Sequence, residues 1–143
     1  LSQQELGRMS DYPFTLSDAE WRQRLTPDQY AVMRQHGTER PGSCGLLREK
    51  RPGSFHCAGC GQALFQGGTK FESGTGWPSF YEAVDGAVGT RSDYKLVVPR
   101  TEVHCAACGG HLGHVFDDGP PPTGKRHCIN GVALTFSAGT RLG

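Results

Sequence analysis

Two short cysteine motifs carry the clearest chemical signal of this sequence. The first is Cys57-Ala58-Gly59-Cys60-Gly61, and the second, Cys105-Ala106-Ala107-Cys108-Gly109, nearly copies it. Two cysteines separated by two residues can reach one metal ion from a tight turn, and the glycine that follows permits a positive φ. The four cysteine thiolates therefore predict one structural zinc ion per chain, with tetrahedral coordination.

Four cysteine ligands leave no open coordination position for a substrate, so the metal is expected to join two distant segments of the chain. The alternative is that the motifs hold reduced cysteines or disulfide-linked pairs. We consider this the weaker interpretation, because the spacing is typical of metal sites. His56 and His104 adjoin the motifs, but four cysteines already complete the coordination shell.

Two cysteines, Cys44 and Cys128, remain outside the predicted metal site. Arg126, Cys128 and Asn130 alternate along a predicted strand, so their side chains should lie on one face. A guanidinium near the thiol favours the reactive thiolate, and Asn130 can form hydrogen bonds beside it. The alternative is that Cys128 is a small core residue, as free cysteines often are, although its polar neighbours argue against this.

Two histidines and a tryptophan are further candidates for a pocket. His111 and His114 are three residues apart, and no third metal ligand is evident, so an acid–base role is preferred. Alone, each would more often be a surface or core histidine. Trp77 stands between a glycine and a proline. It could line a pocket for a small apolar group, although such a tryptophan usually fills a core.

The composition limits the class of protein. The chain has 143 residues, and 15 basic residues nearly balance 14 acidic ones. This balance argues against a nucleic-acid partner or an anionic membrane surface. No apolar run approaches the ~20 residues that cross a bilayer, and no signal-peptide core is evident. We expect a cytoplasmic monomer. Three disulfides in a secreted protein are the less favoured alternative.

The elements that must position these residues begin with two short helices. Ser17-Asp18-Ala19-Glu20 is a capping box that predicts a helix ending at Leu25. Pro27 suits the first position of a second helix, which Gly37 should end. We predict a flexible tail over residues 1–15 and a single domain over residues 16–143.

Loops and short strands should form the rest of the domain. Residues 38–53 are predicted to be a loop that carries Cys44. Strands are predicted over residues 94–98 and, with clear alternation, over residues 128–136. A rigid turn over residues 118–124 should lead into the last strand. Strands and helices do not alternate regularly, so we predict a mainly β fold with an antiparallel core and short N-terminal helices.

Longer motifs resemble the methionine sulfoxide reductase B family over residues 16–136. They are Gly37-Thr38-Glu39-Arg40-Pro41, Ser73-Gly74-Thr75-Gly76-Trp77-Pro78-Ser79-Phe80, His111-Leu112-Gly113-His114-Val115-Phe116, Asp118-Gly119-Pro120 and Arg126-His127-Cys128-Ile129-Asn130, together with both cysteine motifs. The resemblance implies an enzyme that reduces the R epimer of methionine sulfoxide, free or in proteins. It also implies two antiparallel sheets that meet like a tent, with zinc on the far side from the active site.

The resemblance also implies roles for individual residues. Cys128 would attack the sulfoxide sulfur and become a sulfenic acid, a reversible oxidation state of cysteine. Arg126 and Asn130 would tune the reactivity of Cys128.

The same family resemblance assigns the pocket around the substrate. His111 and His114 would hold the sulfoxide oxygen and help to protonate it, with Asp118 as a supporting carboxylate. Trp77 would stack on the substrate methyl group, and Phe116 would also contact the substrate.

Two positions depart from the family pattern. Thr75 stands where many members carry the cysteine that resolves the sulfenic acid. We therefore expect Cys44 to form a disulfide with Cys128, which thioredoxin would reduce. The alternative is that small thiols recycle Cys128 directly. His127 replaces a frequent tyrosine and could alter the approach of the substrate.

Two other functions are compatible with parts of the sequence. A zinc-knuckle module that binds nucleic acid or protein would explain the paired motifs, but it leaves Cys128, Arg126 and Asn130 without a role. A thiol redox switch without substrate turnover would use Cys44 and Cys128. In that case hydrogen peroxide alone should form their disulfide as readily as sulfoxide does.

Overall fold

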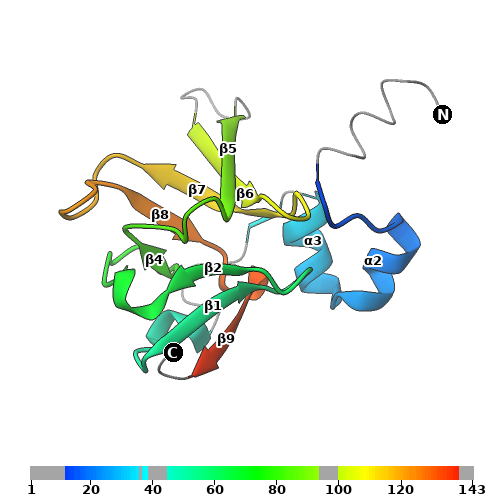
Figure 1. Ribbon diagram of the computed structural model, residues 1–143, viewed down its shortest axis with the longest axis horizontal. Coiled ribbons are helices and arrows are strands. Elements are labelled where there is room, and N and C mark those ends of the chain that lie inside the picture. The colour runs from blue at the N-terminus through cyan, green and yellow to red at the C-terminus, as the bar shows by residue number, and fades with distance from the viewer. Residues whose placement is uncertain (1–11, 36, 39–44, 94–99, 139–143) are drawn as a thin grey trace.

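Two antiparallel β-sheets form the framework of the computed structural model (Figure 1). The structure describes residues 12–35, 37–38, 45–93 and 100–138. The predicted mainly β fold with two short N-terminal helices is confirmed. Cys44 and the predicted strand over residues 94–98 lie outside the described residues.

The larger sheet has the strand order β3-β4-β8-β7-β6-β5, and the smaller sheet has the order β2-β1-β9. The helices and strands are α2 (Asp18–Arg24), α3 (Pro27–Gln35), β1 (Gly53–Cys57), β2 (Ala63–Gln66), β3 (Lys70–Phe71), β4 (Ser79–Phe80), β5 (Val88–Asp93), β6 (Arg100–Cys105), β7 (His111–Phe116), β8 (Arg126–Ile129) and β9 (Leu134–Ala138), with short 3-10 turns η1 (Gly45–Arg48), η2 (Gly67–Thr69) and η3 (Gly131–Ala133).

Helix α2 begins and ends where its sequence predicts. The Ser17 hydroxyl accepts a hydrogen bond from the Glu20 N–H at 3.2 Å, and the Glu20 carboxylate accepts one from the Ser17 N–H at 2.9 Å. These bonds satisfy two N–H groups that have no partner within the helix. Leu25 forms the C-terminal cap, and Trp21 is buried.

Helix α3 follows after a single turn and packs on the domain. It begins at Pro27, as predicted, and the Gly37 N–H bonds to the Ala31 carbonyl at 2.8 Å beyond its last turn. Val32 and Met33 are the buried residues of this helix. No helix among the described residues has both the length and the apolar character needed to span a membrane.

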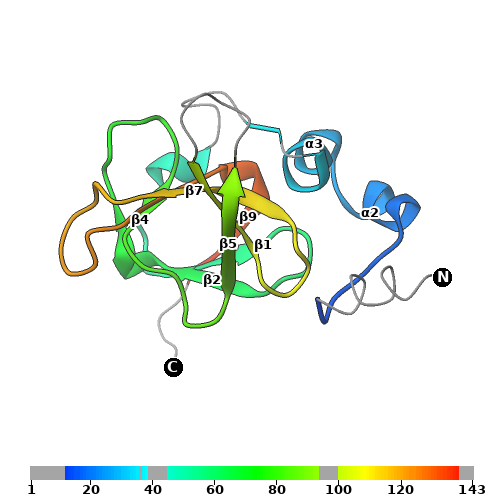
Figure 2. The same cartoon turned by 90° about the horizontal axis from the view of Figure 1, so that it is seen from above.

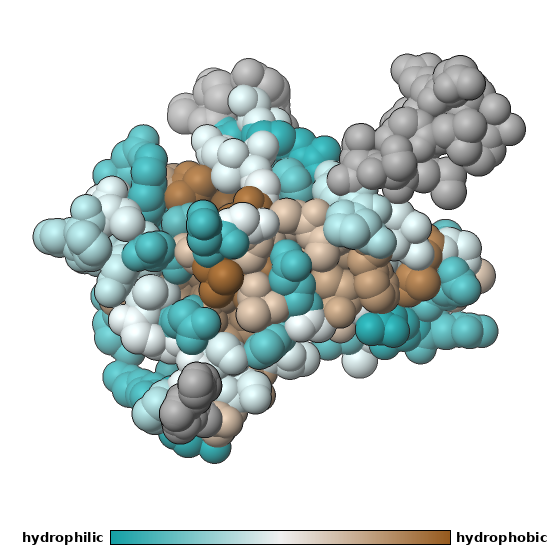
Figure 3. Space-filling model, viewed as in Figure 1, coloured by the Kyte–Doolittle hydropathy of each residue, from teal (hydrophilic) through white to brown (hydrophobic). Residues whose placement is uncertain are grey.

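Aromatic rings fill the space between the two sheets. Phe80 of β4 stacks on Phe65 of β2 with ring centroids 4.3 Å apart, and Phe55 of β1 meets Phe80 edge-on at 5.0 Å. All three side chains are at most 1% exposed. Figure 2 shows α2 and α3 to one side of the strands. In Figure 3, hydrophobic residues occupy the middle of one face and hydrophilic residues surround them.

The prediction of one strand over residues 128–136 is wrong. Strand β8 ends at Ile129, η3 turns the chain, and β9 begins at Leu134 in the other sheet. The Asn130 carbonyl accepts the Ala133 N–H at 3.0 Å, which closes this turn. The apolar alternation continued through the turn because Leu134 enters the same core from the second sheet. Residues after Asn130 therefore do not share the face of Cys128.

The predicted turn between β7 and β8 is confirmed. The Gly119 N–H bonds to the Gly124 carbonyl at 3.0 Å, and the Gly124 N–H bonds to the Pro120 carbonyl at 2.9 Å. A Cβ atom at Gly119 would lie 1.9 Å from the Lys125 carbonyl oxygen, so only glycine fits there. The turn delivers the chain to the start of β8, where Arg126 and Cys128 lie.

Candidate active site and metal centre

The two cysteine motifs fold as matching turns. Each begins at the last residue of a strand, Cys57 of β1 or Cys105 of β6. Gly61 and Gly109 take φ values of 88° and 77°, which favour glycine. Their N–H groups bond to the carbonyls of Cys57 and Cys105, each at 2.8 Å. The near-copy in the sequence is thus also a near-copy in the main chain.

The two turns bring the four predicted metal ligands together. The sulfur atoms of Cys57, Cys60, Cys105 and Cys108 all lie within 4.8 Å of one another. The Cys57–Cys108 and Cys60–Cys105 pairs are 3.7 and 3.6 Å apart. Four sulfurs bound tetrahedrally at ~2.3 Å from a metal would be about 3.8 Å apart. The donor set therefore fits a tetrahedral metal site.

The chemistry of the cluster also suits a bound cation. Hydrogen bonds with the other thiols, Cys105 first, and burial raise the pKa of the Cys57 thiol far above its ordinary value. Four thiolates in this volume would repel one another without a positive charge between them. Neither His56 nor His104 belongs to the cluster. His56 instead contacts Ser54 and the main chain at 2.8 and 3.1 Å.

The N-terminal helices cover the metal centre. Arg34 of α3 donates to the Cys108 carbonyl at 3.1 Å, and Arg24 of α2 donates to the Gly59 carbonyl. The Phe14 N–H also bonds to the Ala107 carbonyl at 2.8 Å, within the second cysteine motif. The helices and both sheets therefore meet at the four cysteines.

A row of polar side chains crosses five strands of the larger sheet. Successive register partners are Ser79 of β4, Cys128 of β8, His114 of β7, Glu102 of β6 and Arg91 of β5. Residues opposite each other in antiparallel strands project from the same face. The sheet thus places a hydroxyl, a thiol, an imidazole, a carboxylate and a guanidinium side by side.

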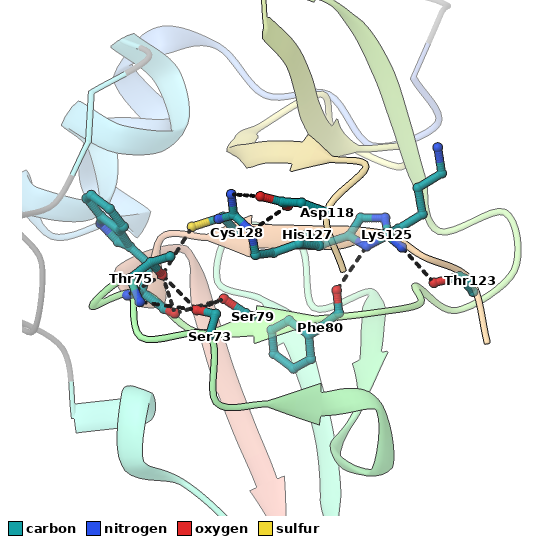
Figure 4. Close-up of polar contacts among 11 residues, drawn as sticks. Ser73, Thr75, Ser79, Phe80, Asp118, Thr123, Lys125, His127 and Cys128 are labelled. Atoms are coloured by element: carbon teal, nitrogen blue, oxygen red, sulfur yellow. Dashed lines mark hydrogen bonds and ion pairs between the residues drawn. The ribbon is translucent and has the colours of Figure 1, made fainter. Parts of the chain in front are cut away.

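This row lies on the face of the sheet away from the smaller sheet. His127, the neighbour of Cys128 in β8, points to the opposite face, where its ring lies 5.7 Å from that of Phe65. It also contacts the Phe80 carbonyl through Nδ1 at 3.1 Å (Figure 4). Burial lowers the pKa of His127 below its ordinary value. The side chain of His127 therefore faces the core rather than the thiol.

A cavity of about 300 Å³ opens above Cys128. Ten residues line it: Thr38, Thr75, Trp77, Arg100, Gly113, His114, Phe116, Arg126, Cys128 and Asn130. Six of these are residues that the sequence proposed for catalysis or substrate binding. Among the described residues, Cys128 is the one cysteine outside the metal cluster. The thiol left over by the metal-site assignment is thus the thiol that faces a cavity.

Arg126 and Asp118 form an ion pair beside the thiol (Figure 4). The guanidinium donates to the two carboxylate oxygens at 2.9 and 3.1 Å. The hydrogen bond to Asp118 raises the pKa of Arg126. Arg126 in turn lowers the pKa of Asp118. Asp118 is not among the cavity-lining residues, and it reaches the thiol through Arg126.

His111 stands behind His114 rather than in the cavity wall. The two rings meet edge-on with centroids 5.5 Å apart. His111 Nδ1 lies 2.7 Å from Glu102 Oε2, and the other Glu102 oxygen lies 2.7 Å from Arg91. Both His111 and Glu102 are at most 3% exposed. Glu102 therefore fixes the orientation of His111, and the Nδ1 atom that faces the carboxylate carries the proton.

Asn130 is held at the exit of β8. Its Nδ2 atom and its main-chain N–H both donate to the Leu112 carbonyl, each at 2.9 Å. A Cβ atom at Gly113 would lie 2.1 Å from the Cys128 carbonyl oxygen, so β7 and β8 approach closely here. These contacts set the position of Cys128 relative to His114.

Sequence reasoning missed Glu102, Arg100 and the side chain of Thr38. Glu102 and Arg100 lie in β6, a strand that no motif marked, and the sequence does not specify which strand it pairs with. Thr38 belongs to a quoted family motif, which was the one signal available. Cys44, the expected resolving cysteine, lies outside the described residues.

Comparison with known proteins shows which family the chain resembles over most of its length. Residues 25–138 match the SelR domain family. A peptide methionine sulfoxide reductase MsrB from Methanosarcina barkeri is 56% identical over 121 residues, which cover 84% of this chain and 85% of that protein. The protein of the same name from Leifsonia xyli is 56% identical over 128 residues, covering 88% of this chain and 92% of that protein.

A third relative is similar to the same extent. The peptide methionine sulfoxide reductase MsrB from Agrobacterium fabrum is 53% identical over 121 residues, which cover 84% of this chain and 90% of that protein. The domain match spans both cysteine motifs and the strand that carries Cys128. The chain therefore belongs to the SelR domain family, the family of the peptide methionine sulfoxide reductases MsrB.

Proposed function

We propose that this enzyme reduces methionine-R-sulfoxide, free or in proteins, to methionine, with Cys128 as the nucleophile. The observation that carries the proposal is the position of Cys128. Its thiol faces a cavity that also contains a guanidinium, an imidazole and an indole ring. A soft nucleophile beside hydrogen-bond donors and an apolar surface suits a substrate with a polar S–O bond and a methyl group.

In the first step the Cys128 thiolate attacks the sulfoxide sulfur. The sulfoxide oxygen takes up a proton and is transferred to the cysteine sulfur, and methionine leaves. The substrate sulfur is reduced by two electrons, and Cys128 is oxidised to a sulfenic acid. Arg126 favours the thiolate by its charge, and Asn130 holds the end of β8 in place.

His114 is the imidazole that reaches the substrate. It is the direct register partner of Cys128 and lines the cavity, so it can hold and protonate the sulfoxide oxygen. His111 supports it from behind, and Asp118 supports Arg126. Trp77 and Phe116 supply aromatic walls for the methyl group and the side-chain stem of the substrate.

Cys44 then resolves the sulfenic acid. Its thiol attacks the Cys128 sulfur, water leaves, and a Cys44–Cys128 disulfide forms, which thioredoxin reduces. Thr75 supports this route. It occupies the position where many members of the family carry the resolving cysteine, and its hydroxyl oxygen lies 3.7 Å from Cys128 Sγ. A hydroxyl cannot form a disulfide.

The metal centre is structural, with zinc as its metal. The four cysteines would hold the ion and fix the ends of β1 and β6 against the helices, and no step of the reaction passes through it. We also propose that the enzyme works as a monomer in the cytoplasm.

Two assays test the reaction. With the R sulfoxide, a thioredoxin-coupled assay should consume NADPH, and the S sulfoxide should give at most a background rate. Cys44→Ser should release methionine in a single turnover but stop in repeated turnover with thioredoxin. If neither epimer is reduced, a zinc-knuckle binding module becomes the better explanation.

Peptide mapping separates the enzyme from a thiol redox switch. Sulfoxide should produce the Cys44–Cys128 disulfide with release of one methionine per disulfide. Hydrogen peroxide at the same concentration should produce the disulfide more slowly. Equal rates with both oxidants would favour the switch, and unchanged steady-state turnover in Cys44→Ser would exclude Cys44 from the mechanism.

A further inference from the structure

Three hydroxyl groups form a chain that ends at the Cys128 sulfur (Figure 4). Ser79 Oγ lies 2.7 Å from Ser73 Oγ, which lies 2.8 Å from Thr75 Oγ1. Thr75 Oγ1 lies 3.7 Å from Cys128 Sγ. At the far end, Ser79 Oγ lies 3.1 Å from the Trp77 carbonyl oxygen. The chain thus connects a carbonyl, which can only accept, to a sulfur that donates as a thiol and accepts as a thiolate.

Thr75 Oγ1 also lies 3.5 Å from the Trp77 carbonyl oxygen, which gives its proton a second, longer contact. Each hydroxyl has one proton, so a chain that runs continuously through all three hydroxyls has two arrangements. In the first, the Cys128 thiol donates to Thr75, and every hydroxyl in turn points towards the Trp77 carbonyl. In the second, every hydroxyl points towards the sulfur, and Thr75 donates to the Cys128 thiolate. The ionisation of Cys128 therefore selects the direction of the whole chain.

Main-chain donors hold the oxygen atoms in place in both arrangements. The Thr75 N–H donates to Ser73 Oγ at 3.3 Å, and the Trp77 N–H donates to Thr75 Oγ1 at 3.4 Å. Ser79 is 1% exposed and sits in β4 as the register partner of Cys128. Because the oxygens are fixed, reversal requires only rotation of the O–H bonds.

We propose that these three hydroxyls are a reversible donor chain that stabilises the Cys128 thiolate. Thr75 touches the reacting sulfur, whereas Ser73 and Ser79 are positioning residues behind it. No proton travels along the chain, since each hydroxyl keeps its own and the thiol proton leaves to solvent through the cavity. The inference deepens the proposed function and rests on Cys128 as the nucleophile. It also gives a role to Thr75 where many relatives are expected to carry cysteine.

The direction of the chain predicts effects of opposite sign. Thr75→Val removes the one hydroxyl that reaches the sulfur, so the thiolate loses a charge-assisted hydrogen bond. Ser79→Ala removes the acceptor that draws the Ser73 proton away from Thr75. Ser73 should then donate to Thr75, and Thr75 should turn towards Cys128 even before the thiol ionises. If the hydroxyls only made the surroundings of Cys128 polar, both substitutions would disfavour the thiolate.

The experiment measures the alkylation rate of Cys128 against pH. Iodoacetamide is used on the zinc-loaded protein in a Cys44→Ser background, and mass spectrometry assigns the modified peptide. The variants are Thr75→Val, Thr75→Ser and Ser79→Ala. Thr90→Val is the control, because Thr90 is exposed in β5. Zinc content and the thermal unfolding curve of each variant show that it is folded.

In Thr75→Val the midpoint of the rate curve should move up by about one pH unit, the size expected for one hydrogen bond to a charged group. Thr75→Ser should keep the midpoint of the parent, and Thr90→Val should not move it. Ser79→Ala should move it down by about half a pH unit, since the chain is then biased towards the sulfur.

Two results would overturn the inference. If Thr75→Val keeps the midpoint of the parent, the hydroxyl does not stabilise the thiolate. If Ser79→Ala raises the midpoint, the hydroxyls do not act as a directed chain. No sulfoxide is present in these measurements, so they give an answer whether or not the turnover assays support the proposed function.

Discussion

The five described cysteines lie in two unlike environments. The four of the metal centre lie in two matching turns that follow β1 and β6, and their sulfur atoms lie within 4.8 Å of one another. Cys128 lies within a strand, and its neighbours are a guanidinium, an imidazole and a hydroxyl beside a cavity. The contrast teaches that thiols gathered in a tight cluster suit a bound cation. A thiol surrounded by donors, with open space above it, can react with a substrate.

The largest effect should come from the cavity thiol. Cys128→Ser should lower sulfoxide reduction at least about a thousandfold, because serine is a poor nucleophile for this step. The variant should keep its metal and its unfolding temperature, since Cys128 is not a ligand. Turnover with the R sulfoxide, metal content and thermal unfolding test these expectations. Residual activity near that of the parent would place the nucleophile elsewhere.

Substitution in the metal centre should lower the stability of the fold and leave the Cys128 thiol reactive. Cys60→Ser should lose the metal and destabilise the fold by about 5 kcal/mol or more, because metal binding contributes directly to folding. A loss of that size lowers the unfolding temperature by about 10–20 °C. Measurement well below that temperature should still show alkylation of Cys128. A metal-free variant with the stability of the parent would remove the structural role of the site.

The buried carboxylate of the polar row should matter less than either group of cysteines. Glu102→Gln should lower kcat about tenfold to a hundredfold, since His111 loses the carboxylate that fixes its proton on Nδ1. The pH profile of kcat should change shape as well, which a purely structural role would not cause. Glu82→Gln, an exposed carboxylate, is the matched control. Equal pH profiles for Glu102→Gln and the parent would contradict the role of Glu102.

Local patterns predicted the parts of the molecule that depend on neighbouring residues. The Ser17 capping box, the start at Pro27 and both cysteine turns require only a few adjacent residues, and the structure confirms them. The mainly β fold followed from the same kind of pattern and from the family resemblance.

Those local patterns could not predict which strands pair or in which register. Glu102 lies in the site because β6 pairs with β7 in one particular register. No local motif specifies that register. The break in the predicted strand after Ile129 has the same origin. Leu134 fits the alternation along the chain, yet it belongs to a second sheet that only the folded core defines.

The smallest predicted effect concerns His127, which lies on the face of β8 opposite to Cys128. Burial lowers the pKa of His127, so as the pH falls below ~6.5 the unfolded chain takes up a proton before the folded one does. The contribution of the neutral ring to stability is therefore present above that pH and is lost as the pH falls to the lower folded pKa.

His127→Phe should remove this part of the pH dependence. Between about pH 7.5 and pH 5, the parent should lose about 2 °C more of its unfolding temperature than the variant does. Parallel curves would mean that His127 does not carry the effect. The alkylation profile of Cys128 should not move, because the His127 ring contacts Phe65 and the Phe80 carbonyl on the other face. A shift of that profile would show that the faces of β8 are coupled, and that the residue replacing the frequent tyrosine acts on the thiol through the strand.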